Sequence, residues 1–280
     1  NNIIVAFFIF NTGFSQILPN DFYELKFVEL DYYKGQNWDK NSIIRNLRFK
    51  DVMSLELVEK PYFIRLGTNF IDNNLMIESY GKYCFNKNFY SYFHFKLTQN
   101  PNYDVSFSGL EQKRGRFGFY AGEMDLSGIG YENNLFLIEI SRGKENITAG
   151  DDLDLFIGRN SPSYDYFNFE IFKNKNRLKF FHGSLNSTGE NINRYLVGKA
   201  YEFNNSSDFI FSISELIIYS GLNRSIDFAY LNPISSHLEI ELNDRQNMLG
   251  GRNANAIWAL NIDKFFFKTL RTSLNYFIDE

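Results

Sequence analysis

Apolar and polar residues alternate with a period of two over much of the chain from residue 61 to its end. In FYSYFHFKLT (89–98), the odd positions carry phenylalanine, leucine and one serine, whereas the even positions carry tyrosine, histidine, lysine and threonine. LRTSLNYFID repeats this arrangement, with Leu270, Leu274, Tyr276 and Ile278 alternating with polar residues. Such alternation predicts β-strands that have one apolar face and one polar face.

Short turn sequences separate some of these strands, and longer polar connections separate others. FNKN (85–88) and KNKN (173–176) have the composition of tight hairpin turns, and longer polar stretches occur at 99–104, 158–165, 184–193 and 243–253. The pattern predicts an all-β, antiparallel up-and-down sheet with one elaborated end. In a soluble sandwich the apolar face would form the core, whereas in an outer-membrane barrel it would face lipid.

The chain divides into three parts. Residues 1–15 contain the apolar run Ile3–Phe10 followed by the small residues Gly13 and Ser15, which predicts the remnant of a secretory signal peptide, with a buried N-terminal strand as the alternative. Residues 16–60 are more charged and less regular, and either a capped helix or a pair of strands would fit them. Residues 61–280 are predicted to supply the barrel strands.

Composition narrows the class of protein. Aromatic residues make up 18% of the 280 residues, with 31 Phe and 18 Tyr, which favours extended structure because rings pack well on pleated surfaces. The net charge of −4 is spread along the chain, so no basic field is present that would attract nucleic acid. The single cysteine, Cys84, excludes an intramolecular disulfide framework.

Motifs for metal or cofactor binding are absent from the sequence. The three histidines, His94, His182 and His237, are far apart and show no zinc-ligand spacing. The acidic run DDLD (151–154) could bind calcium, but it lacks the glycine and distal glutamate of a calcium loop, so a solvated turn is the preferred interpretation. We therefore expect no metal and no cofactor.

A pair of carboxylates raises the question of glycosidase chemistry. Glu239 and Glu241 lie two residues apart in LEIEL, which, read as a strand, points both side chains to one face. Glycoside hydrolysis needs two carboxyl groups on opposite sides of the scissile bond. Polar strand faces commonly offer such pairs, so we prefer a non-catalytic interpretation.

One carboxylate interrupts an apolar face. Phe209, Phe211 and Ile213 share a face of the predicted strand, and Glu215 falls on that face two residues later. Either a β-bulge turns the strand there, or Glu215 is buried with a cationic partner. Arg194 and Arg224 are the nearest candidates, and we predict a structural Glu–Arg pair inside a lumen.

Several stretches of the C-terminal half resemble the capsule-assembly Wzi family of outer-membrane proteins, in its Bacteroidetes-like form. The similarity runs through residues 128–167, 182–186, 191–203 and 214–242 and ends in LRTSLNYFIDE. Its most specific part is RYL, SExxIY and YLNP, which contain Arg194, Glu215, Tyr219 and Tyr230–Pro233. Lys199 stands where relatives have His or Arg. The chain stops at NYFIDE, so the resemblance predicts a barrel truncated at its C-terminus.

The resemblance implies a monomeric β-barrel in the outer membrane of a Gram-negative bacterium. Such a barrel would bind capsular or other surface polysaccharide, contact outer-membrane lipid and assist capsule assembly without catalysis. The alternatives are a secreted soluble β-fold enzyme that acts on glycans through Glu239 and Glu241, and a general outer-membrane porin. The candidate carbohydrate-binding residues are Arg194, Glu215, Tyr219, Arg224, Tyr230 and Asn232.

Overall fold

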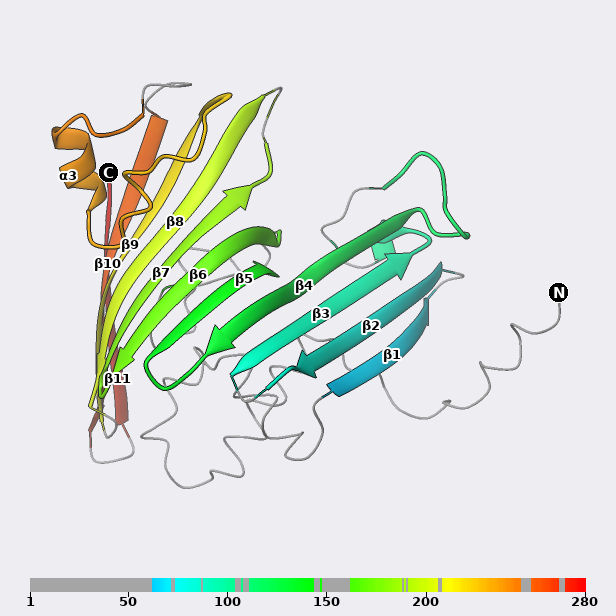
Figure 1. Ribbon diagram of the computed structural model, residues 1–280, viewed down its shortest axis with the longest axis horizontal. Coiled ribbons are helices and arrows are strands. Elements are labelled where there is room, and N and C mark those ends of the chain that lie inside the picture. The colour runs from blue at the N-terminus through cyan, green and yellow to red at the C-terminus, as the bar shows by residue number, and fades with distance from the viewer. Residues whose placement is uncertain are drawn as a thin grey trace.

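The computed structural model describes residues 62–71, 74–86, 88–103, 107, 111–143, 147, 162–187, 189, 191–205, 208–247, 253–266 and 270–280. In this part of the chain, eleven strands form one sheet in sequence order, and each strand is antiparallel to the next (Figure 1). They are β1 (Tyr62–Ile71), β2 (Asn74–Cys84), β3 (Phe89–Thr98), β4 (Ala121–Glu132), β5 (Phe136–Gly143), β6 (Tyr164–Lys173), β7 (Asn176–Leu185), β8 (Ile192–Asn204), β9 (Phe209–Leu222), β10 (Asn253–Phe266) and β11 (Leu270–Asp279).

The predicted all-β up-and-down architecture is therefore confirmed, and the sheet is open between β1 and β11. The described helices are the short 3₁₀ helix η4 (Pro101–Tyr103) and α3 (His237–Leu242). None of the helices in the described part is long and apolar enough to cross a membrane. The predicted signal remnant, the segment 16–60 and the DDLD run lie outside the described residues.

Connections of different length gather at the two ends of the sheet. At one end, the short-turn end, strands are joined by residues 85–88, 133–135, 174–175, 205–208 and 267–269. At the other, the long-connection end, they are joined by residues 72–73, 99–120, 144–163, 186–191 and 223–252. The predicted hairpins at 85–88 and 173–176 are thus confirmed, as is one elaborated end.

The sheet buries its polar side chains and exposes its apolar ones. In β3 the buried positions include Tyr90, His94 and Lys96, while the phenylalanines between them are partly exposed. We call the face that contains Tyr90 the polar face and the opposite one the apolar face. Cross-strand pairing places on the polar face the buried residues Glu78, Glu123, Glu139, Asn168, Glu170, Lys179, Glu202, Ser212, Asn261 and Asp263. It places on the apolar face the exposed residues Ile64, Leu66, Phe70, Ile138, Ile140, Phe167, Ile171, Leu178, Ile213, Leu274 and Ile278.

Two glycines of β4 allow tyrosines to cross the polar face. Gly130 and Gly128 are the register partners of Tyr90 and Tyr92, and a Cβ on either glycine would lie less than 3 Å from the tyrosine ring. Across these glycines, the hydroxyls of Tyr90 and Tyr92 donate hydrogen bonds to the Glu139 carboxylate on β5, at 2.7 and 2.9 Å. The carboxylate is therefore buried with two hydrogen-bond donors, which offsets its desolvation.

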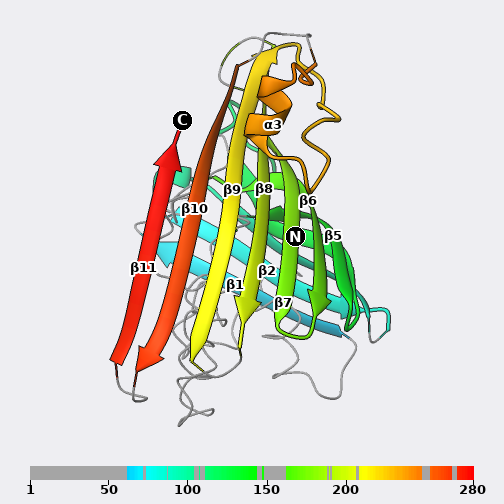
Figure 2. The same cartoon turned by 90° about the vertical axis from the view of Figure 1, so that its left-hand side faces the viewer.

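The connection after β9 folds back onto the apolar face. We call its described residues, 223–247, the ledge; they include α3, which begins at Ser236, whose side chain accepts a hydrogen bond from the Glu239 amide. Tyr230 and Ile240 of the ledge pack with Val197 and Ile217 of the sheet in one buried cluster. Figure 2 shows α3 in front of β8 and β9, with β1 and β2 behind them, so the ledge lies on the convex side of the sheet.

Candidate functional site

Polar side chains gather on the polar face at the long-connection end of β8, β9 and β10. Arg194, Ser220 and Asn253 are direct register partners across these three strands, and Asn255 is the next polar-face residue of β10. Both asparagines are exposed, and Arg194 and Ser220 are half-buried. We call these four residues the rim patch. Their guanidinium, hydroxyl and amide groups are donors and acceptors of the kind that sugar hydroxyls require.

A buried arginine holds the strand ends behind the rim patch. Arg224 is fully buried, and its Nη1 donates to the carbonyl oxygens of Ser220 (3.1 Å) and Asn253 (3.0 Å). Its Nη2 lies 3.4 Å from the Asp227 carboxylate, and its guanidinium lies 4.8 Å from the centroid of the Tyr219 ring. Arg224 therefore fixes the backbone that carries two rim-patch residues.

A stack of rings joins the ledge to the sheet. Tyr219 lies between Tyr195 and Tyr230, with ring centroids 4.8 and 4.7 Å away, and its hydroxyl contacts His182 Nε2 at 2.8 Å. The Tyr230 hydroxyl contacts His237 Nδ1 at 2.9 Å. The stack thus combines ring packing with satisfied polar ends.

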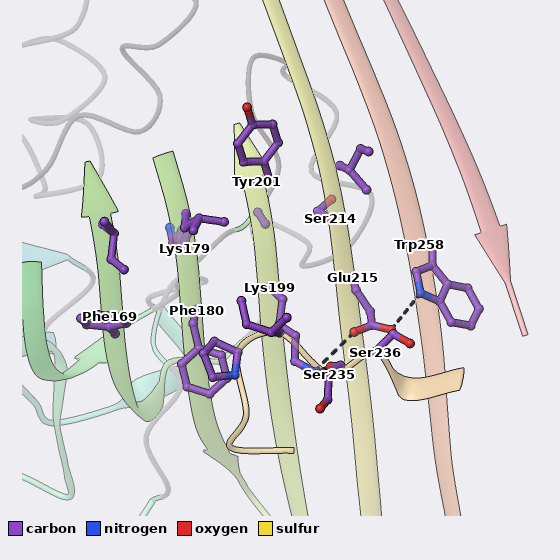
Figure 3. Close-up of a pocket in the computed structure, with 16 residues that line it drawn as sticks. Phe169, Lys179, Phe180, Lys199, Tyr201, Ser214, Glu215, Ser235, Ser236 and Trp258 are labelled. Atoms are coloured by element: carbon purple, nitrogen blue, oxygen red, sulfur yellow. Dashed lines mark hydrogen bonds and ion pairs between the residues drawn. The ribbon is translucent and has the colours of Figure 1, made fainter. Parts of the chain in front are cut away.

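Glu215 joins the ledge to three strands of the sheet (Figure 3). Its carboxylate lies 3.5 Å from Lys199 Nζ, and it accepts hydrogen bonds from Trp258 Nε1 (2.8 Å) and the His237 backbone amide (2.7 Å). Lys199 also donates to the carbonyl of Ser235 in the ledge. We call Lys199, Glu215 and Trp258 the latch, because each is on a different strand and together they bind the ledge backbone.

The latch corrects part of the prediction for Glu215. The residue is buried and has a cationic partner, as predicted. The partner is Lys199, its direct neighbour on β8, and not Arg194 or Arg224. The pairing of β9 shows no register shift at this position, so no bulge turns the strand there. Glu215 lies on the apolar face beneath the ledge and not on the polar face.

LEIEL is helical, which corrects the prediction of a strand for Glu239 and Glu241. Residues two apart in a helix point about 200° apart around its axis, so the two carboxylates do not share a face. Glu239 accepts a hydrogen bond from Arg245, and Glu241 lies 3.8 Å from His237 Nε2. The arrangement lacks the facing carboxylates that glycoside hydrolysis needs.

An apolar groove lies beside the latch, between the ledge and the sheet. Its volume is about 370 Å³. The sheet contributes Ile171, Leu178 and Ile213, and the ledge contributes Pro233 and Ile234. Lys199 and Glu215 are at its wall, already bound to each other, so the groove offers mainly apolar contact.

The six predicted carbohydrate-binding residues are divided between the two faces. Arg194 is in the rim patch, Arg224 and Tyr219 are buried behind it, and Glu215 is in the latch. Tyr230 is buried in the ring stack, and Asn232 is exposed on the ledge, where its side-chain oxygen accepts from the Ile234 amide. Carbohydrate contact by any of them stays a prediction.

Sequence reasoning missed three of the four rim-patch residues and two of the three latch residues. The alternation NANA at 253–256 could have placed Asn253 and Asn255 on one face of a strand. The register of the β8–β9 hairpin places Lys199 opposite Glu215 and Ser220 opposite Arg194, whereas Trp258 depends on the register of β10.

One group of side chains could hold a metal ion. Atoms of His237, Glu241 and Glu280 lie within 4.8 Å of one another, with His237 Nε2 3.2 Å from the Glu280 carboxylate. One imidazole and two carboxylates suit a divalent cation such as Zn²⁺, and the same contacts form ion pairs when His237 is protonated. Motif spacing did not reveal this group, because Glu280 follows β11 whereas the other two residues are in α3.

Comparisons of the chain with protein-family models and with curated proteins find no match. The resemblance to the Wzi family therefore rests on the sequence stretches given above, and the function that the resemblance implies is a proposal.

Proposed function

We propose that this chain forms the wall of an outer-membrane β-barrel that binds surface polysaccharide and assists capsule or surface-glycan assembly without catalysis. The observation that carries the proposal is the inverted burial of the sheet: charged residues are buried on one face and large apolar residues are exposed on the other. A soluble sandwich would bury its apolar face, whereas a membrane barrel turns that face to lipid.

The arrangement of the connections supports the same proposal. Outer-membrane barrels have short turns on the periplasmic side and longer loops on the extracellular side. In this sheet the long connections after β3, β5 and β9 all occur at one end. The proposed orientation therefore places the long-connection end, with the rim patch, at the cell surface.

The rim patch is the proposed contact for polysaccharide. It lies on the polar face at the end proposed to meet the capsule, and two of its four residues are exposed asparagines. Neutral hydrogen bonds to sugar hydroxyls contribute only about 0.5–1.5 kcal/mol each. Binding would thus depend on many weak contacts along a chain of repeated sugars, which suits an assembly role.

The alternative of a soluble glycan-active enzyme has weaker support, because its two proposed carboxylates occupy different sides of α3. The alternative of a general porin would require unselective conductance in planar bilayers, and it shares the membrane location with our proposal.

The membrane location has a direct test. We expect the full-length protein, expressed in a Gram-negative host, to sediment with the outer-membrane fraction and to migrate differently on gels before and after boiling. Recovery in the soluble periplasmic fraction, with no change of mobility on boiling, would contradict the barrel.

Substitutions in the rim patch are expected to weaken polysaccharide binding in steps. Arg194→Ala, Asn253→Ala and Asn255→Ala should each reduce affinity by roughly 2- to 10-fold, which corresponds to one hydrogen bond. Binding can be measured on a glycan array and by titration with the capsular polysaccharide that binds best.

Asn86→Ala is the matched control, because Asn86 is also an exposed asparagine whose side-chain oxygen accepts from a backbone amide, and it is at the short-turn end, away from the rim patch. Equal losses of affinity from Asn86→Ala and from the rim-patch variants would contradict the assignment of the rim patch. Normal binding by the triple rim-patch variant would do the same.

A further inference from the structure

We propose that the ledge is embedded in the membrane, with its outward side chains in contact with lipid acyl chains. Loops at the surface end of a barrel ordinarily extend into water, so this would be an additional lipid-binding surface. The inference rests on the proposed function, and its test below separates the failure of one from the failure of the other.

The outward surface of the ledge carries several large apolar side chains. Phe228, Ile234 and Leu242 have 84%, 78% and 75% of their surface exposed. Leu238 and Leu242 are one helical turn apart, on the side of α3 opposite the buried His237 and Ile240. The large exposed apolar residues of the ledge are Ile226, Phe228, Ile234, Leu238 and Leu242.

The apolar face beneath the ledge is too short to span a bilayer by itself. On β9 the ledge packs over Ile217 and Tyr219. Phe209, Phe211 and Ile213 are the apolar-face residues of β9 on the other side of the latch, toward the short-turn end. The five residues from Phe209 to Ile213 cover about 14 Å between the first and last Cα atoms, and less when the strand is tilted. The apolar band of an outer-membrane barrel is about 25 Å tall, so the outward surface of the ledge would have to supply the remainder.

Two carboxylates of the ledge, Asp227 and Glu239, are paired, which lowers the cost of placing them close to lipid. The Asp227 carboxylate accepts from the backbone amides of Ala229 (3.0 Å) and Asn247 (2.8 Å). Glu239 is neutralised by Arg245. In hydrocarbon an unsatisfied polar group costs several kcal/mol, and irregular backbone is tolerated only where its groups are bonded.

The groove beside the latch continues this surface onto the sheet. Ile171, Leu178, Tyr201 and Ile213 are register partners in one row across β6 to β9, and all four line the groove. Ile234 of the ledge closes the opposite side. An acyl chain lying along the sheet would therefore meet continuous apolar surface from the exposed row to the ledge.

Spin labels on single cysteines test the inference in lipid nanodiscs. The native Cys84 is replaced by serine, and one cysteine is then introduced at Phe228 or Leu242 on the ledge. Leu274→Cys, at an exposed apolar-face position of β11, is the lipid reference. Asn186→Cys, exposed in the connection after β7, is the water reference. Collision rates with oxygen and with a water-soluble nickel chelate are measured for each label.

We expect the ratio of oxygen to nickel collisions at positions 228 and 242 to match position 274 and to exceed position 186 severalfold. If positions 228 and 242 match position 186 while position 274 is in lipid, the ledge inference is overturned and the barrel stands. If position 274 is also in water, the proposed function itself is overturned. Because positions 228 and 242 are exposed, the substitutions leave the packed interior intact.

Discussion

Replacing Arg224 with methionine is expected to lower the free energy of unfolding by about 3–5 kcal/mol, the usual effect of removing one partner from a buried ion pair. Arg224 is fully buried, and so is Asp227, whose carboxylate would lose its cation. The carbonyl oxygens of Ser220 and Asn253 would also lose their shared donor. Methionine fills a similar volume, so the loss is chiefly electrostatic.

Urea-induced unfolding in lipid vesicles, followed by tryptophan fluorescence, measures this change. The control is Lys175→Met, outside the ledge, because Lys175 is an exposed cation in the 174–175 connection at the short-turn end. Surface substitutions of this kind change stability by about 0–0.5 kcal/mol. A loss for Arg224→Met no larger than that of the control would show that Arg224 does not hold the strand ends together.

The Arg224→Met substitution should also disturb the rim patch. Since Arg224 fixes the backbone at Ser220 and Asn253, we expect Arg224→Met to weaken polysaccharide binding even under conditions in which the protein stays folded. Lys175→Met should leave binding unchanged.

The strands were predictable because alternation is a local property of the sequence. The faces of 89–98 and 270–279 were assigned correctly from period two alone. Which face is buried was not predictable, because a soluble sandwich and a membrane barrel share the same alternation and differ only in what surrounds the sheet.

The helix at 237–242 was missed because LEIEL alternates like a strand. Its N-terminal signal was present: Ser236 precedes the helix with Glu239 three residues later, and Pro233 interrupts any preceding strand. Packing of Ile240 against Val197 and Ile217 favours the helix there. Such contacts join residues far apart in the chain, so a local pattern could not supply them.

The partner of Glu215 was missed because only nearby arginines were considered. The polar run NNSSD (204–208) is a turn signal, and in the structure the strands on either side of it pair Asn204 with Ile210. Counting five residues outward in each strand then places Lys199 opposite Glu215, as the register shows. Trp258 required the register of β10, which follows the long connection and cannot be counted from a tight turn.

The second large loss of stability is expected when the latch is broken. Glu215→Met is expected to lower the free energy of unfolding by about 3–5 kcal/mol, because Lys199 would remain buried without its counter-ion. Trp258 Nε1 and the His237 amide would lose their acceptor as well. Glu111→Gln, which removes an exposed carboxylate from the connection after β3, is the control and should change stability by less than about 1 kcal/mol.

The double variant Lys199→Met/Glu215→Met separates the ion pair from simple loss of packing. Removing both charges eliminates the uncompensated cation, so we expect the double variant to be more stable than Glu215→Met alone, although it still lacks the acceptor for Trp258. In a Trp38→Phe background, Trp258 fluorescence reports the ledge, since this indole packs against the cluster that contains Tyr230 and Ile240 of the ledge. In Glu215→Met, the Trp258 fluorescence should change at lower urea concentrations than the tyrosine fluorescence of the sheet, because the ledge should detach before the sheet unfolds. Additive losses in the double variant would mean that Lys199 and Glu215 do not stabilise each other.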